Sequence, residues 1–282
     1  MATEYIKHFG LAETPFARNH DLRWLYLSSQ HKEAVLKTRW TVEEHGGLAL
    51  IRGGVGQGKS FLIDYLMAVW PSQFGWNCAK LQNTGTITSP RTLLAEVMGA
   101  FGLERSYSAR EMVNRLEEWL LETTYDSNQT VVLFVDEAQS ISSRAMPVLR
   151  DLLNLETRDK ILLQIVLSAQ PNIDHKLTYY PALQSRIASV STLEPLSPTE
   201  TDAMLLHRFT RAKAPDPIYL CPAETVHEIY RYSHGVPRDI VVVTEAAMKE
   251  AFLRGSDRIL PEHVTLASVD LAARKSKSAR AA

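Results

Sequence analysis

The sequence has 282 residues, of which 45% are hydrophobic and 22% charged, and its formal net charge is −1. Such a globular protein has room for one large core or two small ones, and the small net charge excludes a uniformly basic nucleic-acid-binding surface but not a local basic patch. No stretch reaches the roughly 18 apolar residues of a membrane helix, and the opening MATEYIKHFG lacks the pattern of a signal peptide. We therefore expect a cytoplasmic protein without membrane contact.

Cysteine and histidine indicate neither a disulfide framework nor a zinc site. Cys78 and Cys221 form no Cys-x-x-Cys pair, and the nine histidines are scattered without the spacing of metal ligands.

Residues 1–47 are predicted to form an amino-terminal arm and a first helix. The arm contains the aromatic residues Phe9, Phe16 and Trp24 around Pro15. Because aromatic side chains carry large apolar surfaces, we expect the arm to pack on the core.

A glycine-rich turn follows the first predicted strand, LALIR at 48–52, and precedes a helix expected from about 60 to 70. Residues 53–60 fit the pattern Gly-x-x-x-x-Gly-Lys-Ser, in which backbone N–H groups surround a polyphosphate. Lys59 would meet the β- and γ-phosphates and Ser60 would hold Mg²⁺, whereas a chance lysine in a glycine-rich turn is disfavoured by the flanking strand and helix. The candidate nucleotide-binding residues of this turn are Gly53, Gly54, Val55, Gly56, Gln57, Gly58, Lys59, Ser60 and Phe61.

Residues 48–195 show an alternation of strand-like and helical segments. After LALIR, the apolar runs are NCAKLQ at 77–82, TVVLFVD at 130–136 and LLQIVLSA at 162–169. Amphipathic stretches separate these runs, which is typical of a parallel sheet covered by helices on both faces.

An acidic pair, Asp136 and Glu137, ends the third of these runs. Parallel sheets bind ligands at the carboxyl ends of their strands, so this pair is expected to face the phosphate turn. Asp136 would support the Mg²⁺ site and Glu137 would orient and polarise a water molecule for attack on the γ-phosphorus. A strand that merely ends in two acidic residues is the structural alternative.

Residues 196–272 are predicted to form a small all-helical domain, because strand signals stop at Ser197. The expected helices cover about 198–213, 223–233, 238–254 and 261–273. The remaining segment, 273–282, is basic and rich in small residues, so we expect it to be disordered.

Taken together, these motifs resemble the AAA+ ATPases, and within them the ExeA-like or general secretion pathway protein A branch with its transposition relatives TniB, TnsC and MuB. The similarity covers about residues 5 to 270. Besides the two motifs above, it rests on YIKHFGLAETPF, LRWLYLSSQHKEAV, LRDLLNLETRDKILLQIVLSAQPNI, LQSRI, LEPLS and SHGVPRDI. It implies a P-loop NTPase fold, with a helix-sandwiched parallel sheet followed by a helical lid, that hydrolyses ATP with Mg²⁺ between subunits.

The resemblance also assigns roles to single residues. Gln170 matches a polar sensor, Arg186 matches an arginine finger that reaches a neighbouring subunit's nucleotide, and Arg238 matches the sensor of the lid. The arginine fork suits phosphate oxygens. As alternatives, Gln170 could close a strand, Arg186 could form a surface ion pair, and Arg238 could cap a helix or pair with Glu245. Arms of these ATPases pass beside the adenine ring, so Phe16 or a neighbour is a candidate for the base pocket.

Two tasks remain open for such an ATPase. Secretion members of the branch continue into a membrane helix and a cell-wall-binding region, whereas this sequence ends at Ala282. We therefore expect first a transposition regulator, which forms an ATP-dependent ring or helical filament on double-stranded DNA without sequence specificity and recruits a transposase. The alternative is an ATPase that assists assembly of a secretion complex. A degenerate nucleotide-binding signalling module is disfavoured by the intact Lys59 and Glu137.

Candidate DNA contacts are predicted in or beside two polar loops, LQNTGTITSPRTLL and LERSYSARE. They are Thr86, Arg91, Arg105 and Arg110, whose side chains are suited to phosphate contacts. Each could instead be an ordinary solvated residue.

Overall fold

The computed structural model describes residues 4–16, 21–81 and 83–281, with side chains through Leu271. Contacts divide the chain into two compact units. The sheet unit comprises Ser29–Val55 and Lys59–Glu194, and the helical unit comprises Met1–Ser28, Gly56–Gly58 and Pro195–Ala282.

The sheet unit is built on five parallel strands in the order β2-β3-β4-β1-β5. The strands are β1 (Leu48–Gly53), β2 (Asn77–Leu81), β3 (Val131–Val135), β4 (Leu163–Ala169) and β5 (Ile187–Leu193). Every residue of β3 and β4 is buried, because helices cover both faces of the central strands. The predicted α/β fold with a parallel sheet is confirmed.

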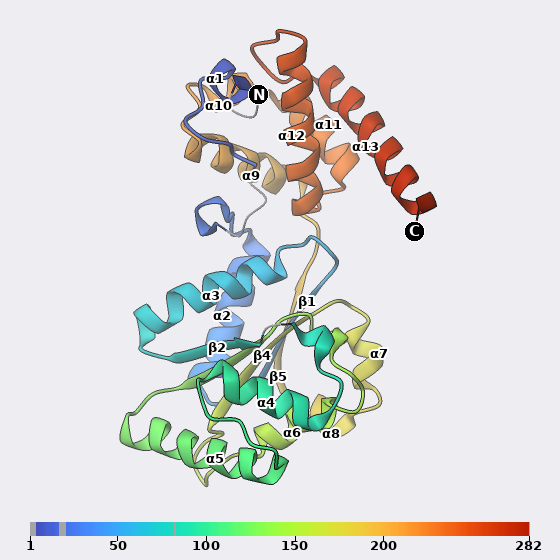
Figure 1. The fold of residues 1–282 in the computed structure, drawn as a ribbon. Coiled ribbons are helices and arrows are strands. Elements are labelled where there is room, and N and C mark those ends of the chain that lie inside the picture. Colours follow the sequence, from blue (N-terminus) through green and yellow to red (C-terminus); the bar gives the residue numbers. More distant parts are fainter. Residues whose placement is uncertain (1–3, 17–20, 82, 282) are drawn as a thin grey trace. The chain divides into compact units, whose positions relative to one another are not determined.

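Helices of the sheet unit lie on both faces of the sheet (Figure 1). They are α2 (Ser29–Glu43), α3 (Lys59–Phe74), α4 (Pro90–Ala100), α5 (Ala109–Leu121), α6 (Met146–Leu153), α7 (Ile173–Leu177) and α8 (Pro181–Gln184). Helices α2 and α3 cover one face, α4 and α6 cover the other, and α5 packs against α4. Since strand side chains alternate between faces, Phe134 meets Trp70 of α3 at 5.5 Å between ring centroids, while its neighbours Leu133 and Val135 enter the core under α4 and α6.

The helical unit follows the sheet, as predicted. Its helices are α1 (Glu4–His8), α9 (Pro198–Arg211), α10 (Pro217–Leu220), α11 (Ala223–Ser233), α12 (Pro237–Leu253) and α13 (Pro261–Ala281), with the 3₁₀ helix η1 (Leu22–Trp24). A capping box between Ser197 and Glu200 starts α9, where Pro198 occupies the first turn.

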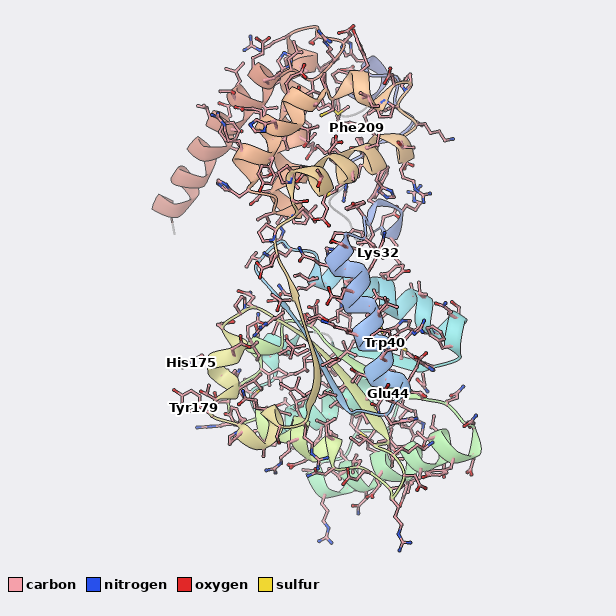
Figure 2. All side chains as sticks on the ribbon, turned by 180° about the vertical axis from the view of Figure 1, so that it is seen from behind. Lys32, Trp40, Glu44, His175, Tyr179 and Phe209 are labelled. Atoms are coloured by element: carbon pink, nitrogen blue, oxygen red, sulfur yellow. The ribbon has the colours of Figure 1, made fainter. Side chains whose placement is uncertain are left out.

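The amino-terminal arm contributes to the core of the helical unit. Phe9, Phe16 and Trp24 are at most 5% exposed and belong to the same hydrophobic cluster as Phe209 of α9. The rings of Phe16 and Phe209 meet edge to face at 5.4 Å. Figure 2 labels Phe209 among the side chains of the helical unit. Phe16 therefore acts as a core residue in this structure.

Two elements differ from the sequence-based expectations. Strand β5 has no counterpart among the predicted strands, because its sequence IASVSTL mixes small, polar and apolar residues and several of its side chains are exposed at the edge of the sheet. Helix α13 continues to Ala281 through the segment predicted to be disordered, and its Ala, Lys and Arg residues have high helix propensity. Ala282, the end of that predicted tail, lies outside the described residues. Among the described residues, we find no helix that combines the length and the apolar character needed to span a bilayer.

The loop before α12 gives a test of packing in the helical unit. Gly235 has a φ of +74°, and a Cβ at this position would lie 2.1 Å from the carbonyl oxygen of Leu196. We expect Gly235→Ala to lower the free energy of unfolding by about 3 kcal/mol or more, because strain and a backbone clash add together. Gly255 has a φ of +68° with no atom within 4 Å of the added Cβ, so Gly255→Ala is the matched control and should cost about 1 kcal/mol. Equal losses in denaturant titrations of the two variants would contradict the clash.

Candidate functional site

The turn between β1 and α3 uses glycine where the backbone needs it. Gly56 and Gly58 have φ values of +82° and +92°, which side chains disfavour. Within the helical unit, the backbone N–H of Arg238 donates to the Gly56 carbonyl at 3.2 Å, and a Cβ on Gly56 would lie 2.9 Å from the Cβ of Arg238. The loop thus leaves little space for side chains at its centre.

Lys59 begins α3 with a buried ammonium group. The residue is 4% exposed, and its Nζ donates to the carbonyl oxygens of Gly53 at 2.8 Å and Gly54 at 2.9 Å. A charged group is expensive to bury unless it is well hydrogen-bonded or paired. The first N–H groups of a helix also attract negative charge, so this turn is chemically suited to an anion.

Asp136 follows β3 and has both carboxylate oxygens engaged. Oδ1 accepts a hydrogen bond from the Ser168 hydroxyl of β4 and another, at 3.0 Å, from the backbone N–H of Glu137. Oδ2 lies 3.6 Å from Nζ of Lys80, which also bonds Asp64 of α3 at 2.7 Å. These contacts fix the carboxylate at the carboxyl edge of the sheet.

Three residues around Asp136 were not predicted from the sequence. They are Ser168, Lys80 and Asp64. The one available signal was a polar residue within a predicted strand, Lys80 in NCAKL and Ser168 in LQIVLSA. Asp64 gave no such signal, because acidic residues are common on helices.

Glu137 adopts a left-handed backbone conformation, with φ 51° and ψ 43°. Its Oε2 accepts from Nε2 of Gln170 at 3.1 Å and from Nε2 of Gln139. Two predicted site residues, Glu137 and Gln170, are therefore brought into contact, and Gln139 is an addition that the sequence analysis missed.

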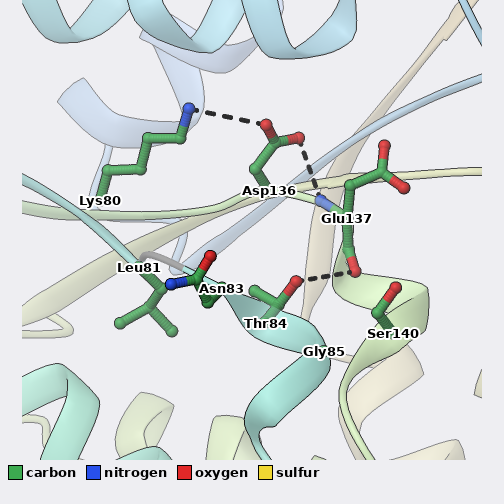
Figure 3. Close-up of a pocket in the computed structure, with 8 residues that line it drawn as sticks. All are labelled: Lys80, Leu81, Asn83, Thr84, Gly85, Asp136, Glu137 and Ser140. Carbon is green, nitrogen blue, oxygen red and sulfur yellow. Dashed lines mark hydrogen bonds and ion pairs between the residues drawn. The ribbon is translucent and has the colours of Figure 1, made fainter.

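A polar pocket of about 400 Å³ opens beside the acidic pair. It is lined by Lys80, Leu81, Asn83, Thr84, Gly85, Asp136, Glu137 and Ser140. Figure 3 shows the Glu137 carboxylate pointing away from Thr84, whose hydroxyl donates instead to the Glu137 backbone carbonyl at 3.3 Å. The pocket and both carboxylates belong to the sheet unit.

Oxygen ligands suitable for a hard cation are present here. Ser60 lies in the first turn of α3 and offers a hydroxyl, and Asp136 offers a carboxylate. Hydroxyl, carboxylate and phosphate oxygens are the ligands that Mg²⁺ prefers. Over the described ranges, no group of three or more His, Cys, Asp or Glu residues could hold a metal.

Arg186 lies at the amino-terminal ends of the strands, whereas the glycine-rich turn lies at their carboxyl-terminal ends. It immediately precedes β5, whose first residue, Ile187, pairs with Leu48 at the start of β1. Its guanidinium donates to Asn154 at 2.9 Å and lies 3.4 Å from Glu156, and its side chain is 36% exposed. The structure therefore does not bring Arg186 to this chain's own glycine-rich turn.

The candidate DNA contacts lie between η2 (Thr84–Thr86) and the first turn of α5. Thr86 donates to the Asn83 carbonyl at 2.8 Å, Arg91 stacks over the Tyr107 ring at 5.2 Å, and Arg105 lies 3.7 Å from Glu96. All four candidates, including Arg110, are exposed. Exposure is compatible with phosphate contacts and equally with solvated side chains.

Comparison with known sequences identifies relatives of the sheet unit and of nearly the whole chain. Residues 42–177 match a family described as "AAA domain". General secretion pathway protein A of Aeromonas hydrophila is 32% identical over 271 residues, which cover 95% of this chain and 48% of the relative. The chain thus spans about half the length of this curated relative.

Solved structures with the same fold include two ORC proteins and a Cdc6p protein. The ORC2 protein of Aeropyrum pernix matches with a TM-score of 0.63 and 19% identity, covering 90% of this chain and 71% of that chain. Cdc6p of Pyrobaculum aerophilum gives a TM-score of 0.66 and 15% identity over 94% of this chain and 70% of that chain. Drosophila ORC bound to DNA matches with a TM-score of 0.65 and 17% identity, covering 95% of this chain and 65% of that chain. At these identities the likeness concerns the fold.

Proposed function

We propose that this chain, which is an ATP-hydrolysing enzyme, binds ATP and Mg²⁺ on the turn at 53–61 and hydrolyses ATP at Glu137. The proposal is supported by its AAA+ fold and by its similarity to general secretion pathway protein A. The observation that carries the proposal is the buried ammonium of Lys59 at the start of α3, on the same sheet edge as Asp136 and Glu137. Cation, helix start and acidic pair are the groups that phosphoryl transfer requires.

The glycine-rich turn would bind the phosphates of ATP. Its backbone N–H groups donate to phosphate oxygens, and Lys59 exchanges its carbonyl contacts for the β- and γ-phosphates. Ser60 and Asp136 would hold Mg²⁺, which supplies positive charge against the phosphate oxygens. Ser168 keeps the Asp136 carboxylate oriented through its hydrogen bond.

Glu137 would polarise the attacking water, because phosphoryl transfer depends mainly on positioning and charge stabilisation. Gln170 lies against the Glu137 carboxylate, which supports its role as the polar sensor of the γ-phosphate. Arg238 starts α12 beside Gly56, which supports a role as lid sensor.

Assembly would place Arg186 at a neighbouring copy's nucleotide. Its position at the amino-terminal edge of the sheet is remote in register from the turn of the same chain, as a residue that acts on another subunit requires. Repetition of one such heterologous contact yields a ring or a helical filament.

The larger task of the ATPase is proposed from its relatives. The similarity to general secretion pathway protein A along 95% of the chain favours an ATPase that assists assembly of a secretion complex. The second candidate, a transposition regulator that assembles on double-stranded DNA and recruits a transposase, rests on the resemblance of its motifs to TniB, TnsC and MuB. DNA binding separates these two tasks.

The first test separates nucleotide binding from hydrolysis. Lys59→Ala should weaken ATP binding by at least about 100-fold, since charged hydrogen bonds contribute about 1.5–3 kcal/mol each. Glu137→Gln keeps the shape of the side chain but loses the carboxylate, so ATP should bind normally while turnover falls by at least about 100-fold. Calorimetry and steady-state phosphate release measure the two effects. If Glu137→Gln hydrolyses ATP at the parental rate, another residue polarises the attacking water.

The second test addresses assembly. Arg186→Ala should bind ATP but not turn it over, and mixing it with Glu137→Gln should restore activity where an intact Arg186 meets an intact Glu137. Because Arg186 also pairs with Glu156 in its own chain, Glu156→Gln is the control and should retain turnover. If mixed assemblies form and no activity returns, Arg186 has a structural role.

The third test concerns DNA. For a transposition regulator, duplex binding should require ATP, persist in Glu137→Gln and weaken steeply with salt, because phosphate contacts release counterions. Arg110→Glu should weaken it, and Arg158→Glu, at an exposed arginine outside the candidate loops, should not. Fluorescence anisotropy over a salt series measures each case. If DNA binding is absent, or does not depend on nucleotide and salt, the transposition task is wrong and the secretion task remains.

A further inference from the structure

Gln139 links two of the predicted catalytic residues of the sheet unit, through the carboxylate of Glu137 and the backbone of Gln170. It lies in the short 3₁₀ turn η4 (Ala138–Ser140) directly after the acidic pair. Its amide Nε2 donates to Oε2 of Glu137, and its amide Oε1 accepts from the backbone N–H of Gln170 at 3.0 Å. One side chain therefore joins the end of β3 to the end of β4.

The two contacts fix how the Gln139 amide is oriented. If the amide were turned over, its oxygen would face the Glu137 carboxylate and its NH₂ would face the Gln170 N–H, so both contacts would be repulsive. The observed assignment is the one that satisfies donor and acceptor together.

The hydrogen bonds on Glu137 are unevenly distributed between its oxygens. Oε2 accepts from both Gln139 and Gln170, which uses the two lone pairs of that oxygen. Among the described residues, none donates a hydrogen bond to Oε1. A carboxylate held by one oxygen in this way presents the other oxygen to a water molecule.

The backbone of Gln139 is itself held in place. Lys176 of α7 donates through Nζ to the carbonyl oxygen of Gln139 at 2.9 Å and also to that of Ile141. Burial lowers the pKa of Lys176, which indicates that its ammonium is partly withdrawn from water. The turn that carries Gln139 is therefore anchored at two carbonyl groups.

We propose that Gln139 is a positioning residue. It directs the Glu137 carboxylate toward the attacking water and holds this carboxylate in position beside Gln170. This inference rests on the proposed ATP hydrolysis at Glu137. Gln139 donates one hydrogen bond to the carboxylate and touches neither nucleotide nor water in this role. Its contribution is the direction of Oε1, and small errors in the position of a reacting group are costly.

Gln139→Glu removes the donated hydrogen bond. Glutamate keeps the length and the acceptor for the Gln170 N–H but has no amide N–H, and it places a second carboxylate beside Glu137. We expect kcat to fall by about 10- to 100-fold with ATP affinity unchanged within about twofold. Gln139→Ala should also lower kcat. Gln73→Glu, on the exposed end of α3, is the matched control and should behave as the parent.

A double variant tests whether Gln139 acts through Glu137. In a Glu137→Gln background, Gln139→Glu should cause little further loss of single-turnover rate, because the carboxylate that it positions is already gone. A full additional loss, or parental kcat in Gln139→Glu alone, would overturn the inference. Retained ATP affinity and an unchanged melting temperature show that the variants are folded.

The same measurements distinguish this inference from the proposed function. If the parent does not hydrolyse ATP, or Glu137→Gln turns over normally, hydrolysis at Glu137 is wrong. If Glu137→Gln loses turnover while Gln139→Glu keeps it, only the role of Gln139 is wrong.

Discussion

The burial of one ammonium group organises the candidate site. Lys59 starts α3 with its Nζ against the carbonyl oxygens of Gly53 and Gly54, and water reaches only a small part of the residue. A charge in this position needs nearby oxygens, and the turn supplies them from its own backbone. The turn curves around the lysine with Gly56 and Gly58 at positive φ, a conformation that favours glycine.

Parallel strand pairing then determines what can face that turn. Because β1 pairs with β4 and β4 with β3, the ends of all three strands lie along one edge of the sheet. Asp136, Glu137 and Gln170 follow the last residues of β3 and β4, so they collect at the edge where β1 delivers the turn. The buried apolar side chains of these strands stabilise the sheet, and the first residues after the strands supply the polar groups of the candidate site.

The sequence was sufficient for the parts of the site that depend on local pattern. The turn at 53–60 and the acidic pair at 136–137 stand out because each interrupts an apolar run at a defined place. The strand β5 was missed, since an edge strand with exposed side chains lacks a continuous apolar pattern. Gln139 and Lys80 were missed for another reason: their importance lies in contacts across strands, and a single sequence records residue type and order but no such distances.

The left-handed backbone of Glu137 has a consequence for how the site works between reaction cycles. A residue with a side chain in this conformation costs of order 1 kcal/mol or more, and the cost is incurred once, when the chain folds. If Glu137 acts as proposed, its backbone already holds this conformation before any ligand arrives and need not rearrange at each turnover. In the proposed reaction the site is preorganised at the expense of stability, so a glycine or asparagine at this position would relieve strain in the fold while removing the group that the strain holds ready.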